Sequence, residues 1–320
     1  MAEVGGGLQP WEQLKLTWEA RRNAPREMMR GAAVADGNLA YFRTGNSDDV
    51  FVYNSENDDW NKLPKCPQNN FGLAVMNNLI TAVGGVVDGQ YTKRLSSFSG
   101  GEWVTVFPPM PTKRRWPAVI SAQNYLIAVG GWGVGGENLS TVEVMDMNTL
   151  EWYTTASLPE PASSMSATVC EGRLYLLGGR DMYDRATHAV FTCTLDSLIC
   201  SCHPPSRTPP HTSEASVWQR VADVPVVFST CITLNGRVMT VSGRDSHGPT
   251  HAVYMYNPES VVWQLLENMP TARSRCLVVG LRDYIIAVGG LIAIDNRYRQ
   301  CATVEVCYLQ LSGGCCEYSV

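Results

Sequence analysis

The sequence predicts an all-β protein: a six-bladed β-propeller with four antiparallel strands in each blade. Three observations predict it. A short apolar strand ending in glycine recurs six times, a tryptophan follows each of the first five copies, and the sixth tryptophan of the series stands near the N-terminus. A four-stranded sheet of this size cannot bury both of its faces alone, whereas six such sheets packed around an axis can. The 320 residues, of which 45% are apolar, supply enough material for that core.

The recurring strand is seen most clearly in the sequences LITAVGG, LIAVGG and IIAVGG. The second glycine is present in all six copies, and the first is replaced by Thr44 in copy one and by Ser242 in copy five. The intervals between successive final glycines are 40, 46, 48, 64 and 47 residues, close to the roughly 50-residue period of one propeller repeat. The glycines that mark the repeat are Gly45, Gly84, Gly85, Gly130, Gly131, Gly178, Gly179, Gly243, Gly289 and Gly290. We expect them where one backbone passes too close to another to leave room for a Cβ atom.

The tryptophans and the prolines that follow them show how the ring closes. The series comprises Trp18, Trp60, Trp103, Trp152, Trp218 and Trp263. A proline stands seven residues after each of them, except that Pro111 stands eight residues after Trp103. Because no tryptophan follows the sixth glycine pair, the segment around Trp18 is predicted to supply the outermost strand of the blade that the C-terminal segment begins.

Each repeat reads as four strands, and the third repeat shows the pattern most simply. Pro117–Ala122 is followed by an Asn-containing turn, the apolar strand Tyr125–Val129, the alternating strand Thr141–Asp146 and a fourth strand opened by Trp152. Asn-Gly, Glu-Gly and Asn-Asn pairs precede the glycine-terminated strand in other copies. Such residues tolerate the positive φ that tight hairpins require.

Composition and charge predict the extent of the propeller and exclude several classes of protein. The propeller is expected over residues 11–311, between a flexible N-terminal tail at 1–10 and a C-terminal tail at 312–320. A net charge of −5 argues against a general nucleic-acid binder, and no apolar run is long enough to cross a membrane. No secretion signal is recognised, so the chain is expected to be cytoplasmic and its eleven cysteines, among them Cys231 and Cys276, to be reduced and structural.

The repeat resembles the kelch repeat over nearly the whole chain. The glycine pair, the tryptophan, the Met-Pro pairs at 110–111 and 269–270 and the Tyr-Asn-Pro at 256–258 carry the resemblance. The arrangement is similar to the propellers of kelch-like substrate adaptors of cullin-based ubiquitin ligases, in which the propeller recognises a target peptide. Those adaptors also carry a BTB domain and BACK linker or an F-box, and nothing in this sequence corresponds to either. The resemblance therefore implies contact with cullin-ligase components through another subunit.

In the kelch family, the loops between blades and those between the second and third strands share one face. In this sequence those loops are rich in arginine, which can donate two parallel hydrogen bonds to a carboxylate or phosphate. We therefore expect a non-enzymatic module that binds an acidic or phosphorylated peptide there, with aromatic anchors in the same loops. The predicted partner-binding residues are Arg30, Arg114, Arg115, Arg180, Tyr183, Arg244, Arg273, Arg275, Arg297 and Tyr298.

The sequence also leaves two alternative functions open. A scaffold for actin or another cytoskeletal protein is the alternative binding role, and a metal- or sugar-dependent propeller enzyme is the alternative of another class. No cofactor and no metal site are expected, and His188 and His251, at equivalent repeat positions, are interpreted as structural. A Pro-rich insertion at about 196–216 contains Cys200, Cys202, His203 and His211, but their spacing matches no common zinc motif, so it is interpreted as an extended loop.

Overall fold

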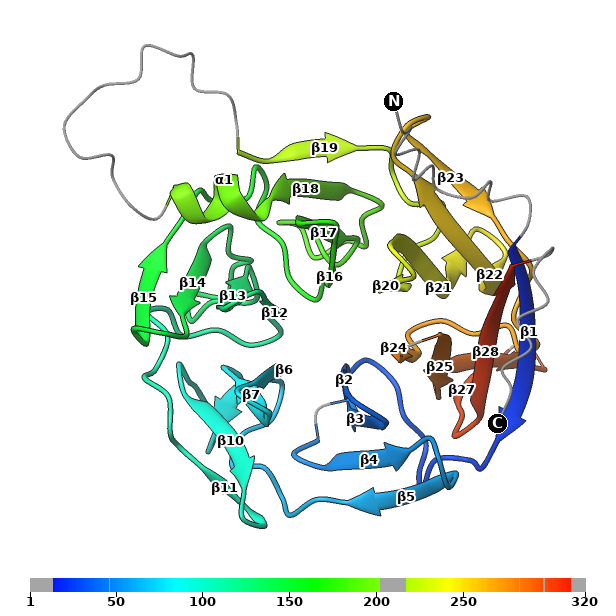
Figure 1. The fold of residues 1–320 in the computed structure, drawn as a ribbon, viewed down its shortest axis with the longest axis horizontal. Helices are drawn as coiled ribbons and strands as arrows, with labels where there is room; N and C mark the ends of the chain where they lie inside the picture. Colours follow the sequence, from blue (N-terminus) through cyan, green and yellow to red (C-terminus); the bar gives the residue numbers. More distant parts are fainter. Residues whose placement is uncertain (1–13, 46, 202–216, 282, 296, 312–320) are drawn as a thin grey trace, which may run out of the picture.

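A computed structural model describes residues 14–45, 47–201, 217–281, 283–295 and 297–311 of the chain. Six four-stranded antiparallel sheets stand around a central axis, which confirms the predicted six-bladed propeller (Figure 1). In each sheet the strand next to the axis is the first of the blade, and the strand that carries the tryptophan, or in blade 4 directly follows Trp218, lies at the rim.

The first three blades follow the chain without interruption. From the axis outward, blade 1 consists of β2 (Ala32–Asp36), β3 (Leu39–Arg43), β4 (Val50–Asn54) and β5 (Asp59–Lys62). Blade 2 consists of β6 (Gly72–Met76), β7 (Leu79–Val83), β10 (Leu95–Ser99) and β11 (Glu102–Val104). Blade 3 consists of β12 (Ala118–Ala122), β13 (Tyr125–Val129), β14 (Val142–Asp146) and β15 (Glu151–Thr154).

The last three blades complete the ring. Blade 4 consists of β16 (Ser166–Cys170), β17 (Arg173–Leu177), β18 (Val190–Thr194) and β19 (Gln219–Val221). Blade 5 consists of β20 (Thr230–Leu234), β21 (Arg237–Asp245), β22 (Gly248–Asn257) and β23 (Val262–Leu265). Blade 6 consists of β24 (Leu277–Leu281), β25 (Tyr284–Val288), β28 (Val304–Leu311) and β1 (Leu14–Arg21).

Blade 6 contains strands from both ends of the described chain, as the position of Trp18 predicts. β1 pairs antiparallel with β28 over its whole length, and Trp18 lies opposite Cys307. Leu16 and Cys307 are buried in the cluster that joins blades 5 and 6. The ring is therefore closed by backbone pairing and apolar packing between segments distant in the sequence.

The recurring residues hold neighbouring blades together. The indole N–H groups of five rim tryptophans donate to a backbone carbonyl in the segment that follows the preceding blade, as Trp103 does to Pro64 at 2.8 Å and Trp60 to Arg22 at 3.2 Å. Gly85, at φ 98°, shows why glycine ends the second strand: a Cβ atom there would clash with the carbonyl of Asn69 in the crossing backbone.

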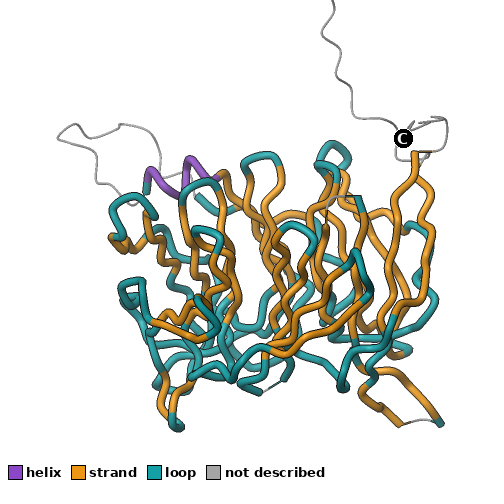
Figure 2. Tube along the Cα trace, turned by 60° about the horizontal axis from the view of Figure 1, so that its bottom comes forward, coloured by secondary structure: helices purple, strands orange, loops and turns teal. Residues whose placement is uncertain are grey.

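The loops differ between the two faces of the disc. On one face the connection between the second and third strands carries extra hairpins: β8 (Val86–Val87) with β9 (Gln90–Tyr91), and β26 (Leu291–Ile294) with β27 (Arg297–Gln300). Helix α1 (Leu195–Cys200) lies on the other face, at the top of Figure 2, between the third and fourth strands of blade 4. We refer to the face with the hairpins as the hairpin face.

Helix α1 corrects the expectation of an extended loop at the start of the insertion. Thr194 caps the helix by accepting from the backbone N–H of Ser197, and Leu195 and Leu198 are buried against the core that contains Trp218. These two apolar residues give the segment a face to bury, which its Ser, Pro and Cys content obscures in the sequence. Cys202, His203 and His211 lie outside the described residues.

Candidate functional site

One residue from each blade forms a ring at the mouth of the axis on the hairpin face. Each of these residues stands two positions before the innermost strand of its blade and has a positive φ between 51° and 59°. The six are Arg30, Asn70, Trp116, Ser164, Phe228 and Arg275, and we call them the mouth ring. Four of the six neighbouring pairs are joined by backbone hydrogen bonds, such as Arg30 N–H to Arg275 O at 3.1 Å and Ser164 N–H to Trp116 O at 3.1 Å. The ring therefore presents six side chains of five kinds from one repeated backbone position.

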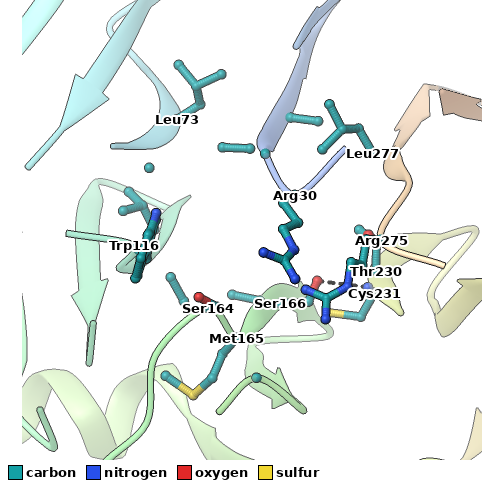
Figure 3. Close-up of a pocket in the computed structure, with 18 of the residues that line it drawn as sticks. Arg30, Leu73, Trp116, Ser164, Met165, Ser166, Thr230, Cys231, Arg275 and Leu277 are labelled. Carbon is teal, nitrogen blue, oxygen red and sulfur yellow. Dashed lines mark hydrogen bonds between the residues drawn. The ribbon is translucent and has the colours of Figure 1, made fainter. Parts of the chain in front are cut away.

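Below the mouth ring lies a cavity of about 350 Å³. Its wall is formed by the starts of the inner strands of all six blades, and Figure 3 shows Arg30, Trp116, Ser164 and Arg275 around it. Four arginines line this cavity: Arg30, Arg43, Arg180 and Arg275. Among the described residues that line it there is no aspartate and no glutamate. A cavity with this lining favours an anionic ligand.

Three of the cavity arginines and Arg244 form a cationic cluster. The guanidinium groups of Arg30 and Arg275 lie next to each other in Figure 3. Burial and the nearby charges of Arg30, Arg180 and Arg244 lower the pKa of Arg275 to about 10, so it remains protonated at neutral pH. Burial and Arg180 likewise lower the pKa of Arg30, against a smaller opposing effect of Asp184. Like charges held this close destabilise the free protein, and an anion between them would remove the repulsion.

Aromatic rings and one carboxylate hold the arginines of this cluster in place. The Arg275 guanidinium carbon lies 3.6 Å from the centroid of the Phe228 ring, and that of Arg180 lies 5.8 Å from it. Arg180 also forms an ion pair of 3.1 Å with Asp184. Stacking on Phe228 thus fixes the Arg275 side chain. None of its hydrogen-bond donors is used by a described carboxylate.

Arg115 sits in a second aromatic environment beside Trp116. Its guanidinium carbon lies 4.1 Å from the Trp116 ring, 5.1 Å from Tyr91 and 5.6 Å from Trp132. Arg115 is half-buried, and its Nε has no hydrogen-bond partner among the described residues. The structure therefore places Arg115 on the wall of blades 2 and 3, apart from the cluster around Phe228.

Arg114 and Arg273 correct the predicted site, because both side chains are completely buried. Arg114 forms an ion pair of 2.9 Å with Glu143 and donates to the carbonyls of Gly130 and Thr141. Arg273 repeats this arrangement in blade 6 with Glu305 and with the carbonyls of Gly289 and Thr303. Their Nη donors are used inside the blade and both side chains are fully buried, so neither is available to a partner in this structure.

The remaining predicted residues lie around the outside of the mouth. Arg244 and Tyr298 contact each other across blades 5 and 6, at 5.2 Å from guanidinium carbon to ring centroid. Arg297 and Tyr298 are exposed on the β26–β27 hairpin, and Tyr183 is exposed in blade 4 under the guanidinium of Arg185. These side chains extend the cationic and aromatic surface outward from the cavity.

Sequence reasoning missed Arg43, which lines the cavity from blade 1. The signal was present: Arg43 ends the strand LAYFR, where the other five copies end in Val or Leu. Asn70 and Ser164 were also missed, because only the positive φ before each inner strand shows that these positions are equivalent.

Among the described residues, no group of three or more His, Cys, Asp or Glu side chains is arranged to hold a metal ion. His188 donates through Nδ1–H to the Val224 carbonyl, 2.7 Å away, which is a contact between neighbouring segments of the fold. Burial raises the pKa of the Cys231 thiol to about 12, so this thiol is protonated at neutral pH.

The part of the chain that the structure describes contains no helix long and apolar enough to cross a membrane.

Comparison with known proteins agrees with this architecture. The kelch motif family matches residues 117–159, which cover blade 3. Kelch-like protein 35 of Mus musculus is 27% identical over 238 residues, which are 65% of this chain and 41% of the relative. Kelch-like protein 25 of Xenopus tropicalis is 24% identical over 241 residues, covering 71% of this chain and 37% of the relative. The matched region thus spans about 40% of the length of these relatives.

The solved structure of YjhT has the same fold. Its TM-score is 0.70, and the match covers 91% of this chain and 99% of that structure. The sequences are only 11% identical, so this likeness concerns the fold alone.

Proposed function

We propose that this chain, a kelch-repeat β-propeller, is a protein-interaction module that binds an acidic or phosphorylated segment of a partner protein at its mouth ring. The observation that carries the proposal is the pair of adjacent arginines, Arg30 and Arg275, above a cavity whose described lining includes no carboxylate. The names of its relatives support a protein-interaction role at the level of the propeller.

The mechanism of recognition is charge-assisted hydrogen bonding from a rigid surface. The mouth ring is fixed by backbone hydrogen bonds between blades, and Arg275 by its stacking on Phe228. Side chains that are already ordered lose little entropy on binding, and arginine pairs with carboxylate or phosphate through two parallel bonds. We propose a non-enzymatic role for this site, because binding through arginine and aromatic side chains needs no nucleophile or general base.

A role as substrate receptor of a ubiquitin ligase is the cellular context we propose. It rests on the resemblance to kelch-like proteins, and contact with cullin-ligase components would come through another subunit or another part of the protein. A cytoplasmic location is proposed on the same basis. The identity of the captured partners distinguishes this context from a cytoskeletal scaffold.

The test is affinity capture from cell extract with the variant Arg30→Glu/Arg275→Glu. The matched control is Arg22→Glu/Arg220→Glu, which makes the same change in net charge at two exposed arginines that form surface ion pairs with Asp59 and Asp223. Circular dichroism and thermal unfolding first establish that both variants are folded. We expect partners that bind the wild type and the control but not the mouth variant.

Acidic segments of those partners are then synthesised and titrated directly at two salt concentrations. We expect affinity to fall as salt rises, since arginine–anion contacts are screened. Capture of the same partners by both double variants would show that the mouth ring does not carry binding.

A further inference from the structure

Arg43 occupies a position that the other blades fill with an aliphatic side chain. It is the last residue of β3 and pairs with the first residue of the innermost strand; the residues in this register in the other blades are Val83, Val129, Leu177, Val241 and Val288. All five are buried with at most 2% exposure, and Arg43 is buried to the same degree, at 2%. Blade 1 therefore places a cation in a site that the fold otherwise keeps apolar.

No carboxylate of the described residues compensates this charge. Among the described residues, the Arg43 guanidinium forms no ion pair; one Nη donates to the carbonyl of Gly45, and Nε has no hydrogen-bond partner. Its guanidinium carbon lies 5.1 Å from the Phe71 ring in blade 2. Arg114 and Arg273, which are equally buried, each have a glutamate partner. An unpaired buried charge is strongly unfavourable, so Arg43 differs in kind from the structural arginines.

Burial lowers the pKa of Arg43 to about 10, which still leaves the guanidinium protonated at neutral pH. The nearby Cys66 does not neutralise it, because burial raises the pKa of that thiol to about 12 and keeps it uncharged. Arg43 also lines the 350 Å³ cavity under the mouth ring together with Arg30, Arg180 and Arg275. Arg43 is thus a further buried cation of the cavity, in the wall of blades 1 and 2. It lies there in addition to the cationic cluster on blades 1, 4, 5 and 6.

We propose that Arg43 is the buried cation of an anion subsite inside this cavity, and that the subsite takes the dianionic phosphate of a phosphate monoester. The proposal goes deeper into the site of the proposed function and rests on it for the location of the ligand. To the proposed function it adds a subsite in the wall of the cavity and a preference of this subsite for phosphate over carboxylate.

Charge balance and geometry favour phosphate. Of the four arginines that line the cavity, only Arg180 forms an ion pair with a described carboxylate, that of Asp184. A phosphate monoester carries a charge of about −1.5 to −2 at pH 7 and three strong acceptor oxygens. A carboxylate carries one negative charge and two oxygens in a plane. Three tetrahedral oxygens can meet donors from several walls of a cavity, whereas both oxygens of a carboxylate accept in a single plane.

The experiment compares the wild type with Arg43→Met, which restores the apolar character of this position in the other blades. The probes are N-acetyl-phosphoserine amide, N-acetyl-glutamate amide and glycerol phosphate, titrated by calorimetry at constant ionic strength. Arg220→Met is the control for the loss of one cation, because Arg220 lies at the rim of blade 4 and is paired with Asp223. Arg43→Lys keeps the charge but removes the planar fork.

We expect Arg43→Met to weaken binding of the phosphoserine probe at least tenfold and to change binding of the glutamate probe less than twofold. Arg220→Met should bind both probes as the wild type does, and Arg43→Lys should recover part of the phosphate affinity. Without ligand, Arg43→Met should unfold at the same or a higher temperature than the wild type. If glycerol phosphate binds as well as the phosphoserine probe, the ligand is a free phosphate ester; if it binds much more weakly, the ligand is a phosphorylated peptide.

Equal phosphate affinity in Arg43→Met and the wild type would overturn the subsite, as would equal affinity of the wild type for glutamate and phosphate. A lower unfolding temperature of ligand-free Arg43→Met, with unchanged phosphate binding, would assign Arg43 a structural role. These results are separable from failure of the proposed function, which is tested by Arg30→Glu/Arg275→Glu and partner capture.

Discussion

The two arginines Arg114 and Arg115 are neighbours in the chain but occupy different environments. Arg114 is completely buried against Glu143, while Arg115 lies half-buried among three aromatic rings. Their sequence does contain a signal for this difference. Glu143 stands in the sequence TVEV of the third strand, and Glu305 stands in the same TVEV beside Arg273 in blade 6. An arginine before the first strand is thus coupled to a glutamate in the third strand of the same blade.

Other blades have different residues at the two positions that correspond to this arginine and glutamate. In blade 2 the equivalents are Gln68 and Ser96, joined by a hydrogen bond of 2.8 Å, and in blade 1 they are Met28 and Phe51, both buried. Polar residues therefore occur as pairs and apolar residues as pairs. This is expected where a lone buried charge is far more unfavourable than either matched combination.

At the residue scale we predict that Glu143→Ala lowers the free energy of unfolding by about 3–5 kcal/mol, because it leaves the Arg114 charge buried without its partner. The double variant Arg114→Met/Glu143→Phe, which copies the pair of blade 1, should recover most of that loss. Urea unfolding of the three proteins measures both values. A double variant no more stable than Glu143→Ala would show that the pair is required for more than charge balance.

At the scale of elements, β1 depends on a partner strand from the other end of the sequence. Its Leu16 N–H donates to the Glu267 side chain at 3.1 Å, on the side away from β28. Because successive N–H groups of a strand face opposite sides, the N–H groups of Lys15 and Thr17 face β28. The closure of the ring thus rests on alternate residues of one short strand.

We predict that Thr17→Pro destabilises the propeller more than Ala20→Pro. The first variant removes a donor that faces β28, whereas the N–H of Ala20, four residues from Leu16, faces away from it, where proline is tolerated on an edge strand. Thermal unfolding should show the larger decrease for Thr17→Pro. Size-exclusion chromatography should also show association of Thr17→Pro, since an unpaired β28 edge can pair with other chains. Equal effects of the two prolines would contradict the assigned hydrogen-bond register.

At the scale of the whole molecule, the ring brings together cations that are distant in the sequence. Arg30, Arg43, Arg180 and Arg275 come from blades 1, 4 and 6, yet they line one cavity in a protein of net charge −5. Two of them, Arg43 and Arg275, have a pKa of about 10, well below the ordinary value of arginine. A folded-state pKa below the unfolded value means that the folded protein releases these protons more readily than the unfolded chain.

We therefore predict that these two charges destabilise the ligand-free protein at neutral pH and that this effect is relieved as the pH rises above about 10, toward the ordinary pKa of arginine. Over the same range, anion binding should be lost, because the guanidinium groups become neutral. Binding titrations between pH 7 and this range, with thermal unfolding of the wild type and Arg43→Met side by side, measure both effects. Only the difference between the two proteins is informative, since tyrosines and lysines also ionise there. A difference that does not change with pH would contradict the shifted pKa of Arg43.

The sequence by itself determined the architecture. The recurrence of the glycine-ended strand, the tryptophan series and the position of Trp18 were sufficient to predict six blades, the order of the strands and the closure by β1, because backbone pairing and apolar burial repeat with the sequence. Only the tertiary structure decided which arginines face the cavity. Burial of Arg114, Arg273 and Arg43 depends on contacts with Glu143, Glu305 and Phe71, which lie on strands or in neighbouring blades 28 to 32 residues away. From the local sequence, all three are simply charged loop or strand residues. Only the packing of the blades decides which arginine is paired with a carboxylate, which is buried without one and which is accessible.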